Sequence, residues 1–221
     1  MAVAPPSPWK NKKGRPRNRD LKREAVLRAA ADLFNEQGFY TTSIDDVARR
    51  LHVTKPTIYH YVENKDDILY QCIRIGVEAT RDAVTGIAGH PGRAIDRLKA
   101  AMREHARITA RDFGMCAIRV GESALSVPRR NRIRRLRREV DHAYRALVQE
   151  GIDEGSLAPC EPKLASFTIA AAIAWISRWY NPDGALSIED IADQSVDMLM
   201  NGLARRPRAP SGRASARRAA R

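Results

Sequence analysis

The stretch from Leu51 to Lys65, LHVTKPTIYHYVENK, decides which fold this chain adopts. Thr54 can cap a new helix, and Pro56 then falls in its first turn, where the missing N–H of proline costs nothing. The spacing predicts a helix of about eight residues, too short to be stable unless it packs on a neighbour. Its predicted inward positions are Val53, Ile58 and Tyr61, and its predicted outward positions are Lys55, Thr57, Tyr59 and His60.

Another short helix is predicted directly upstream of this stretch. Ser43 is its expected N-cap, and Asp46 lies three residues further on, where the acidic member of a capping box lies. The helix is expected to end at Leu51 or His52. Two short helices joined by a tight turn, with hydrogen-bonding side chains near the start of the second, place that second helix in the DNA major groove. The pattern therefore predicts a helix-turn-helix.

Apolar residues recur at helical spacing through nearly all of the remaining chain, and no segment alternates as a strand does. We therefore expect an all-α fold. A first helix is expected from Leu21 to Gln37, with Asp20 as its N-cap and Gly38 as its stop. Further helices are expected over residues 64–85, 93–111, 114–125, 128–154, 162–180 and 187–203.

Basic residues outnumber acidic ones by 39 to 26, and the excess lies at the two ends of the chain. Residues 1–24 carry eight basic and two acidic residues, residues 204–221 carry seven arginines and no acid, and the part between them is neutral. Positive tails bind phosphate backbones by counterion release, without sequence preference and with strong salt dependence. Solvated, disordered ends that keep the protein in solution explain the charge equally well.

Several classes of protein are disfavoured by what the sequence lacks. The longest apolar run, Ile169 to Ile176, is far shorter than the roughly 20 residues of a membrane-spanning helix. The basic, proline-rich N-terminus has no apolar stretch behind it, so we expect no secretory signal and a cytoplasmic protein. Cys72, Cys116 and Cys160 lie too far apart for paired metal motifs, and the common motifs of nucleotide binding and hydrolysis are absent. We therefore expect no metal, no cofactor and no enzymatic activity.

Residues 21–70 contain a series of short elements, which are, in chain order, Leu33-Phe34, Gly38-Phe39, Thr41-Thr42, Asp46-Val47-Ala48, the run from Val53 to Tyr59 and Asn64-Lys65-Asp66. In this order the elements resemble the DNA-binding domain of the TetR family of bacterial transcriptional regulators. Two positions depart from the family pattern. His52 occupies a turn position that the family often fills with glycine, so it must adopt a positive φ, and Val62 replaces the usual phenylalanine.

The resemblance implies which side chains meet double-stranded operator DNA. Thr57 and His60 are placed to reach base edges, with Pro56 or the Thr57 methyl group against a thymine methyl. Thr42, Tyr59 and Lys65 suit phosphate contacts. The alternative is that Tyr59 and His60 are ordinary half-buried residues between helices. The full predicted DNA-binding set is Arg15, Arg17 and Arg19 of a basic arm, with Thr42, Thr54, Lys55, Pro56, Thr57, Tyr59, His60 and Lys65.

The chain is expected to divide into a disordered basic arm (1–19), a helix-turn-helix domain (20–66), a ligand-binding and dimerisation domain (67–203) and a disordered arginine-rich tail (204–221). The last two helices are apolar on more than one face, and in the TetR family these helices form a four-helix dimer interface. We expect a homodimer, because two operator half-sites need two recognition helices on one frame. Burial within one monomer is the alternative.

The segment from Trp175 to Gly184, with Gly151 to Gly155 upstream, resembles a subgroup of TetR-like repressors that sense acyl-CoA thioesters. The resemblance implies a mostly apolar pocket among the middle helices. Residues 129–138 hold seven arginines, which form either a solvated helix face or, at Arg134 and Arg138, a site for an anionic head group such as a CoA phosphate. The predicted ligand-binding set is Met102, His105, Phe113, Met115, Cys116, Leu125, Arg134, Arg138, Trp175, Arg178 and Trp179.

Together, these features predict a TetR-type regulator. It is expected to repress transcription as a homodimer on a pseudo-palindromic operator and to be released by a small apolar or acyl-CoA-like effector. The alternative is a ligand-independent DNA-organising helical protein that uses its basic ends. The two differ in sequence preference, since a repressor must favour its own site over random DNA by orders of magnitude.

Overall fold

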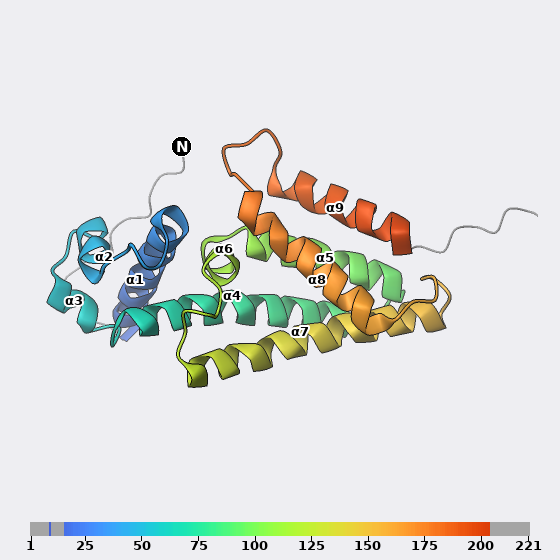
Figure 1. Ribbon diagram of the computed structural model, residues 1–221, viewed down its shortest axis with the longest axis horizontal. Helices are drawn as coiled ribbons and strands as arrows, with labels where there is room; N and C mark the ends of the chain where they lie inside the picture. The colour runs from blue at the N-terminus through green and yellow to red at the C-terminus, as the bar shows by residue number, and fades with distance from the viewer. Residues whose placement is uncertain (1–8, 10–15, 204–221) are drawn as a thin grey trace, which may run out of the picture.

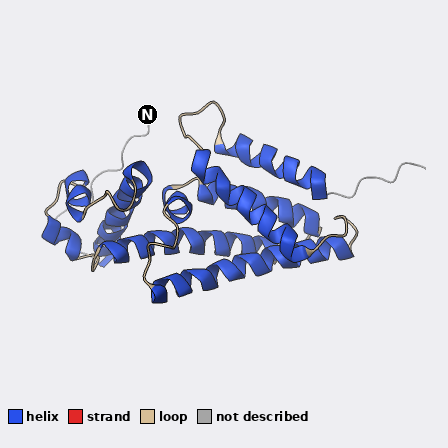
Figure 2. Cartoon of the chain, viewed as in Figure 1, coloured by secondary structure: helices blue, strands red, loops and turns tan. Residues whose placement is uncertain are grey.

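The computed structural model describes Trp9 and residues 16–203, with the side chains of 16–18, 202 and 203 left out. Within these residues the chain forms nine α-helices and no strand, which confirms the all-α prediction (Figure 2). The rest of the expected basic arm and the tail from residue 204 lie outside the described residues. The helices are α1 (Pro16–Gln37), α2 (Ile44–Arg50), α3 (Lys55–Tyr59), α4 (Lys65–Ala88), α5 (Ala94–Thr109), α6 (Asp112–Arg119), α7 (Val127–Asp153), α8 (Pro162–Trp179) and α9 (Ile188–Leu203).

The observed helix boundaries agree with the predicted ones to within a few residues, and the largest differences are in α1, α3 and α6. Helix α1 begins at Pro16 rather than Leu21, so Asp20 is not its N-cap and residues 16–19 are helical. Proline suits a first helical position because its fixed φ is already helical. Helix α3 covers five residues rather than about eight. Helix α6 ends at Arg119, well before the predicted 125, because Gly121 has a left-handed φ of 73° that no α-helix continues through.

Helix α4 connects the two halves of the molecule. Figure 1 shows the N-terminal domain (α1–α3) at one end, with α4 leaving it, α7 along one side of α4, and α5, α8 and α9 on the other. The buried core of the N-terminal domain continues into the first half of α4 and onto α6 and α7. A second buried core fills the space between α5, α7, α8 and α9.

The start of α4 is held by local capping and by a tie to α7. Asn64 is its N-cap and accepts a hydrogen bond from the Asp67 N–H at 2.8 Å. From α7, Arg129 forms ion pairs with Asp66 and with Asp67, the latter at 3.3 Å. The N-terminus of α7 is therefore fixed against the end of the N-terminal domain.

Two glycines let α6 lie close to its neighbours, Gly76 at the contact with α4 and Gly114 at the contact with the end of α5. A Cβ atom on Gly76 of α4 would lie 2.5 Å from the Phe113 carbonyl oxygen, and one on Gly114 would lie 2.0 Å from the Ile108 carbonyl oxygen. Any larger residue at either position would push α6 away from its neighbours. No helix in the described part of the chain is both long and apolar enough to span a bilayer.

Candidate DNA interface and effector cavity

The turn between α2 and α3 has the geometry that the sequence predicted. Ser43 and Asp46 form a reciprocal capping box, with the Asp46 N–H donating to the Ser43 hydroxyl at 3.1 Å and the Ser43 N–H donating to the Asp46 carboxylate at 2.8 Å. His52 adopts a φ of 55°, which confirms the positive φ expected at that position. The Val53 N–H then donates to the Ala48 carbonyl at 3.0 Å and closes the turn.

Helix α3 presents one face to solvent and one to the core. On the inner face of α3, Ile58 is fully buried. On its outer face, Lys55, Pro56 and the C-cap residue His60 are exposed, and 47% of the Tyr59 surface is accessible. The exposure of Tyr59 and His60 disfavours the alternative that they are half-buried packing residues. The outer face of α3 therefore offers an amine, a phenol and an imidazole to a partner.

Two polar contacts hold this face in place. The hydroxyls of Thr54 and Thr57 are hydrogen-bonded at 2.9 Å, so the N-cap residue orients the side chain predicted to read bases. The Lys55 ammonium donates to the Asp45 carboxylate at 2.8 Å, and this hydrogen bond raises the pKa of Lys55. Lys55 therefore stays protonated and is held on the α2 side of the recognition helix.

The α1–α2 turn and the start of α4 form a second part of the same surface. The Lys65 ammonium lies 4.3 Å above the centre of the Phe39 ring, and burial lowers its pKa. Tyr40 is 81% exposed beside it. Tyr40 is not among the DNA-binding residues predicted from the sequence, although its place directly after Gly38-Phe39 is a usable signal. Thr42, by contrast, is buried, and its hydroxyl donates to the Gly38 carbonyl at 2.7 Å.

The predicted basic arm is only partly described. Arg15 lies outside the described residues, and Arg17 belongs to α1 but its side chain is not described. Arg19 is exposed on the first turns of α1. Contact between these arginines and DNA stays a prediction.

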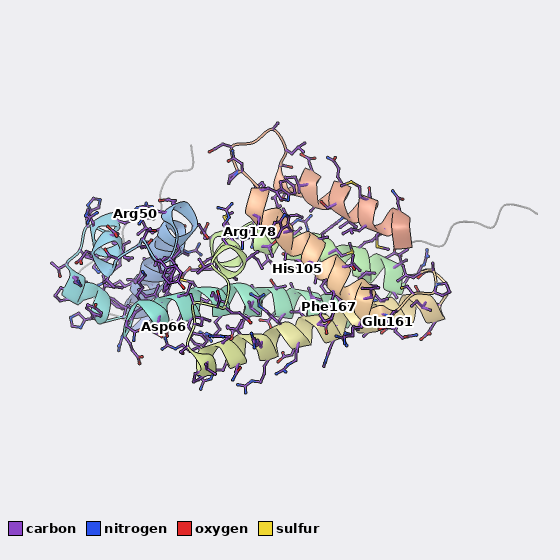
Figure 3. All side chains as sticks on the ribbon, viewed as in Figure 1. Arg50, Asp66, His105, Glu161, Phe167 and Arg178 are labelled. Atoms are coloured by element: carbon purple, nitrogen blue, oxygen red, sulfur yellow. The ribbon has the colours of Figure 1, made fainter. Side chains whose placement is uncertain are left out.

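A cavity of about 410 Å³ lies between α4, α5, α6, α7 and α8. Small residues open much of this space: Gly76, Gly114, Ala117, Ala170, Ala171 and Ala174. Four larger apolar side chains complete its apolar wall: Val77, Ile118, Val140 and Phe167. Its polar lining consists of Thr80, His105, Thr109, Arg137 and Asp141. Figure 3 labels His105 and Phe167 beside α8, on the side that faces α4 and α7.

The predicted ligand-binding residues are scattered relative to this cavity. His105 lines it, whereas Met102, Met115, Cys116 and Leu125 are buried in the surrounding core. Phe113 packs at the α1–α6 contact, with the Arg28 guanidinium 5.6 Å from its ring centre. Arg134, Arg138, Trp175, Arg178 and Trp179 are exposed, and none of the five is among the lining residues. Ligand contact at these ten positions stays a prediction.

His105 is kept neutral at the floor of the cavity. Its Nδ1 atom lies 3.2 Å from the oxygen of the Tyr144 hydroxyl, and this hydroxyl donates its single proton to the Ala101 carbonyl at 3.3 Å. Burial, and then the positive charge of Arg137, lower the pKa of His105 to about 4. Burial also raises the pKa of Tyr144 above its ordinary value, so both rings are uncharged near neutral pH.

Helix α6 touches both the cavity and the N-terminal domain. Its residues Gly114, Ala117 and Ile118 line the cavity. At its other end, the Asn35 side chain of α1 donates to the Asp112 carbonyl at 2.9 Å, and Arg28 pairs with the Asp112 carboxylate at 3.5 Å. A ligand that displaced α6 would therefore act directly on α1.

Helices α8 and α9 each expose large apolar side chains. The exposed fractions are 66% for Leu164, 60% for Trp175, 53% for Trp179 and 70% for Met198. An apolar face of this kind is typical of a surface that another chain covers.

The fold and the exposed face of α3 define a helix-turn-helix DNA-binding regulator. Comparison with known sequences identifies the family. Residues 26–72 match the domain described as bacterial regulatory proteins of the tetR family, and residues 91–203 match the tetracyclin repressor-like C-terminal domain. The chain therefore belongs to the TetR family of transcriptional regulators, which confirms the resemblance seen in residues 21–70 and disfavours the DNA-organising alternative. Members of this family are regulators rather than enzymes.

Individual relatives match about four-fifths of this chain. A TetR/AcrR-family regulator from Thermobifida fusca is 34% identical, with a TM-score of 0.66 over 82% of this chain and 97% of that one. The transcriptional repressor KstR2 of Mycolicibacterium smegmatis is 21% identical over 192 residues, covering 82% of this chain and 90% of its own. AibR, solved in complex with isovaleryl coenzyme A and operator DNA, has a TM-score of 0.72 at 24% identity, over 80% of this chain and 96% of that one.

Proposed function

We propose that this protein represses transcription as a homodimer bound to a pseudo-palindromic operator, and that a small effector in the cavity releases it. The observation that carries the proposal is the position of α6, which lines the cavity with Gly114, Ala117 and Ile118 and holds α1 through Asn35 and Arg28. One short helix thus connects the ligand site to the DNA-binding domain.

In the proposed complex, α3 lies in the major groove. Thr57 and His60 reach base edges, and Pro56 contacts a thymine methyl. Tyr59, Lys65 and the exposed Tyr40 contact phosphates on either side of the groove. The buried hydroxyl of Thr42 is occupied within the α1–α2 turn, so this residue supports the surface rather than contacting DNA through its side chain.

In the proposed dimer, the exposed apolar faces of α8 and α9 pack against the same faces of a second copy. The two-fold symmetry of such a dimer matches that of a pseudo-palindromic operator. Burying Trp175, Trp179 and Leu164 removes large apolar surfaces from water, which is the main source of stability in such an interface.

Release follows from a change in the position of α6 and α4. An effector that occupies the cavity presses on Gly76 of α4 and on Ala117 of α6, and so favours a conformation in which the two recognition helices no longer fit successive major grooves. The coupling is reciprocal, so operator DNA weakens effector binding by the same factor.

The effector that we propose is small and apolar, of the acyl-CoA type. The apolar lining of the cavity supports this class, as does the structural likeness to AibR, whose solved complex contains isovaleryl coenzyme A. A volume of about 410 Å³ accommodates an acyl group but not a whole coenzyme A, so a thioester would leave its nucleotide part outside the cavity.

The test is fluorescence anisotropy with labelled DNA from upstream of the gene, at fixed salt, with random DNA as the control and a panel of acyl-CoA thioesters as titrants. We expect sequence-specific binding that one thioester releases. Equal affinity for random DNA would contradict the proposal that the protein binds a specific operator. Specific binding that no thioester releases would discard the acyl-CoA class.

A further inference from the structure

We propose that Arg137 is the head-group contact of the effector site, and that the effector ends in a carboxylate or thioester oxygen joined to an apolar body of about a dozen non-hydrogen atoms. This inference rests on the proposed function of the cavity as the effector site. It names the residue that selects the effector and the chemistry that the residue selects.

Among the described residues, most polar side chains around the cavity are hydrogen-bonded or ion-paired, whereas the Arg137 guanidinium keeps most of its donors unused. The hydroxyls of Thr80 and Thr109 donate to the Gly76 and Ala106 carbonyls at 3.1 Å and 3.0 Å. His105 is neutral and bonded to Tyr144. The Asp141 carboxylate accepts from the Ser166 hydroxyl at 2.8 Å and forms an ion pair with Arg145.

The Arg137 guanidinium has N–H donors without a hydrogen-bond partner within the described part of the chain, and Arg137 lines the cavity. Its guanidinium makes one hydrogen bond within the described part of the chain, from Nη2 to the Ala117 carbonyl at 3.0 Å, while its Nε is buried without a partner. The side chain keeps 39% of its surface accessible and lines the cavity. A guanidinium carries five N–H donors, and carboxylate and carbonyl oxygens are their natural acceptors.

The charge of Arg137 is only partly balanced. The Glu122 Oε2 atom lies 3.9 Å from the Arg137 Nε, too far for a hydrogen bond, and the Oε1 atom of the same carboxylate is bound to Arg134 at 2.6 Å, so one carboxylate serves two guanidinium groups. Burial lowers the pKa of Arg137, which shows that its environment disfavours the uncompensated charge. An anionic or strongly accepting group in the cavity would relieve this imbalance, whereas a cation would add to it.

The volume of the cavity limits the apolar body. At about 30 Å³ for each water-sized unit, 410 Å³ corresponds to roughly a dozen non-hydrogen atoms. The lining of this space is apolar at Val77, Phe167 and the alanines of α8. An eight-carbon acyl group fits this volume with its oxygen at Arg137. The carbonyl oxygen is common to the free acid and its CoA thioester, so the two must be told apart by experiment.

The experiment is isothermal titration calorimetry on the full-length protein without DNA, with four probes of one chain length. They are octanoate, octanoyl-CoA, 1-octanol and octylammonium. We expect octanoate or octanoyl-CoA to bind at least tenfold more tightly than octanol, and octylammonium to bind most weakly, because a guanidinium forms two charge-assisted hydrogen bonds with a carboxylate, one hydrogen bond with a hydroxyl, and repels an ammonium. Preference between the first two probes identifies the free acid or the thioester.

Variants then locate the preference. Arg137→Met should lower the affinity for the preferred probe at least tenfold and leave octanol unchanged, and Arg137→Lys, which keeps the charge, should retain part of the preference. Arg135→Met is the matched control, since it removes the same charge from a residue of α7 that is exposed and does not line the cavity.

Three results would overturn the proposal: octanol binding as tightly as both acyl probes to the wild-type protein, an undiminished acyl preference in a folded Arg137→Met variant, or no binding of any probe. The wild-type comparison does not depend on whether the variant folds. Fluorescence anisotropy with DNA on the same samples tests the proposed function separately from the role of Arg137. A protein without sequence-specific DNA binding would contradict the proposed function, while the calorimetry would still show whether Arg137 contacts the effector.

Discussion

Substituting Gly76 by alanine tests the close contact between α4 and α6 on which signal transfer depends. The new Cβ would lie 2.5 Å from the Phe113 carbonyl oxygen, whereas ordinary van der Waals contact begins at 3.4 Å. The two helices must therefore separate by the difference, about 0.9 Å, or the carbonyl must turn away. Overpacking of this kind in a rigid contact costs about 1–3 kcal/mol.

Gly86→Ala is the control that isolates this steric cost. Gly86 lies on the same helix, and a Cβ there would meet nothing within 4 Å. Both substitutions gain the same helix propensity of about 0.5–1 kcal/mol, so this contribution cancels when the two variants are compared. We expect Gly76→Ala to be less stable than Gly86→Ala by about 1–3 kcal/mol.

The assay is urea denaturation followed by circular dichroism at one protein concentration, because dimer formation makes stability depend on concentration. Equal slopes against urea would show that both variants unfold from equally compact states. Equal stability of the two variants, or a Gly76→Ala protein more stable than Gly86→Ala, would refute the tight α4–α6 contact.

Three further predictions concern the floor of the cavity, the recognition helix and the dimer face. The folded state lowers the pKa of His105 to about 4 from an ordinary 6.5, so the unfolded chain binds a proton before the folded protein does as pH falls. The free energy of unfolding should therefore decrease between pH 6.5 and pH 4, by up to about 3 kcal/mol. His105→Gln should remove this pH dependence in unfolding curves measured across the same range. Tyr59→Phe should weaken operator and random DNA equally, whereas Thr57→Ala should reduce discrimination between them by about 1–3 kcal/mol in anisotropy titrations; equal effects of the two substitutions would contradict their assigned roles. Trp175→Glu should yield monomers in sedimentation experiments, and an intact dimer would exclude this part of α8 from the interface.

The DNA-binding domain was predictable because its determinants are local in sequence. The capping box from Ser43 to Asp46 and the positive φ of His52 each depend on a few neighbouring residues, and all were found as expected. The start of α1 was missed because the residues after Pro16 carry no apolar stripe to mark them as helical.

The cavity was not predictable in the same way, because it depends on the lack of large side chains at positions that come together only in the fold. It exists where glycines and alanines from separate helices meet, and no sequence pattern marks such a meeting. Arg137 was also hidden within its run of arginines. Only the rotation of α7 against α6 and α8 decides that Arg137 faces inward while Arg138 faces solvent.

Reciprocal coupling is the central claim of the proposed mechanism, and it can be measured from the effector side. The measurement is calorimetric titration of octanoyl-CoA, or of octanoate if that probe binds more tightly, into the protein alone and into the protein saturated with its operator. We expect operator DNA to weaken effector binding by the factor by which the effector weakens operator binding. Identical effector affinity with and without operator, in a protein that binds both, would show that the cavity and the recognition helices are not coupled.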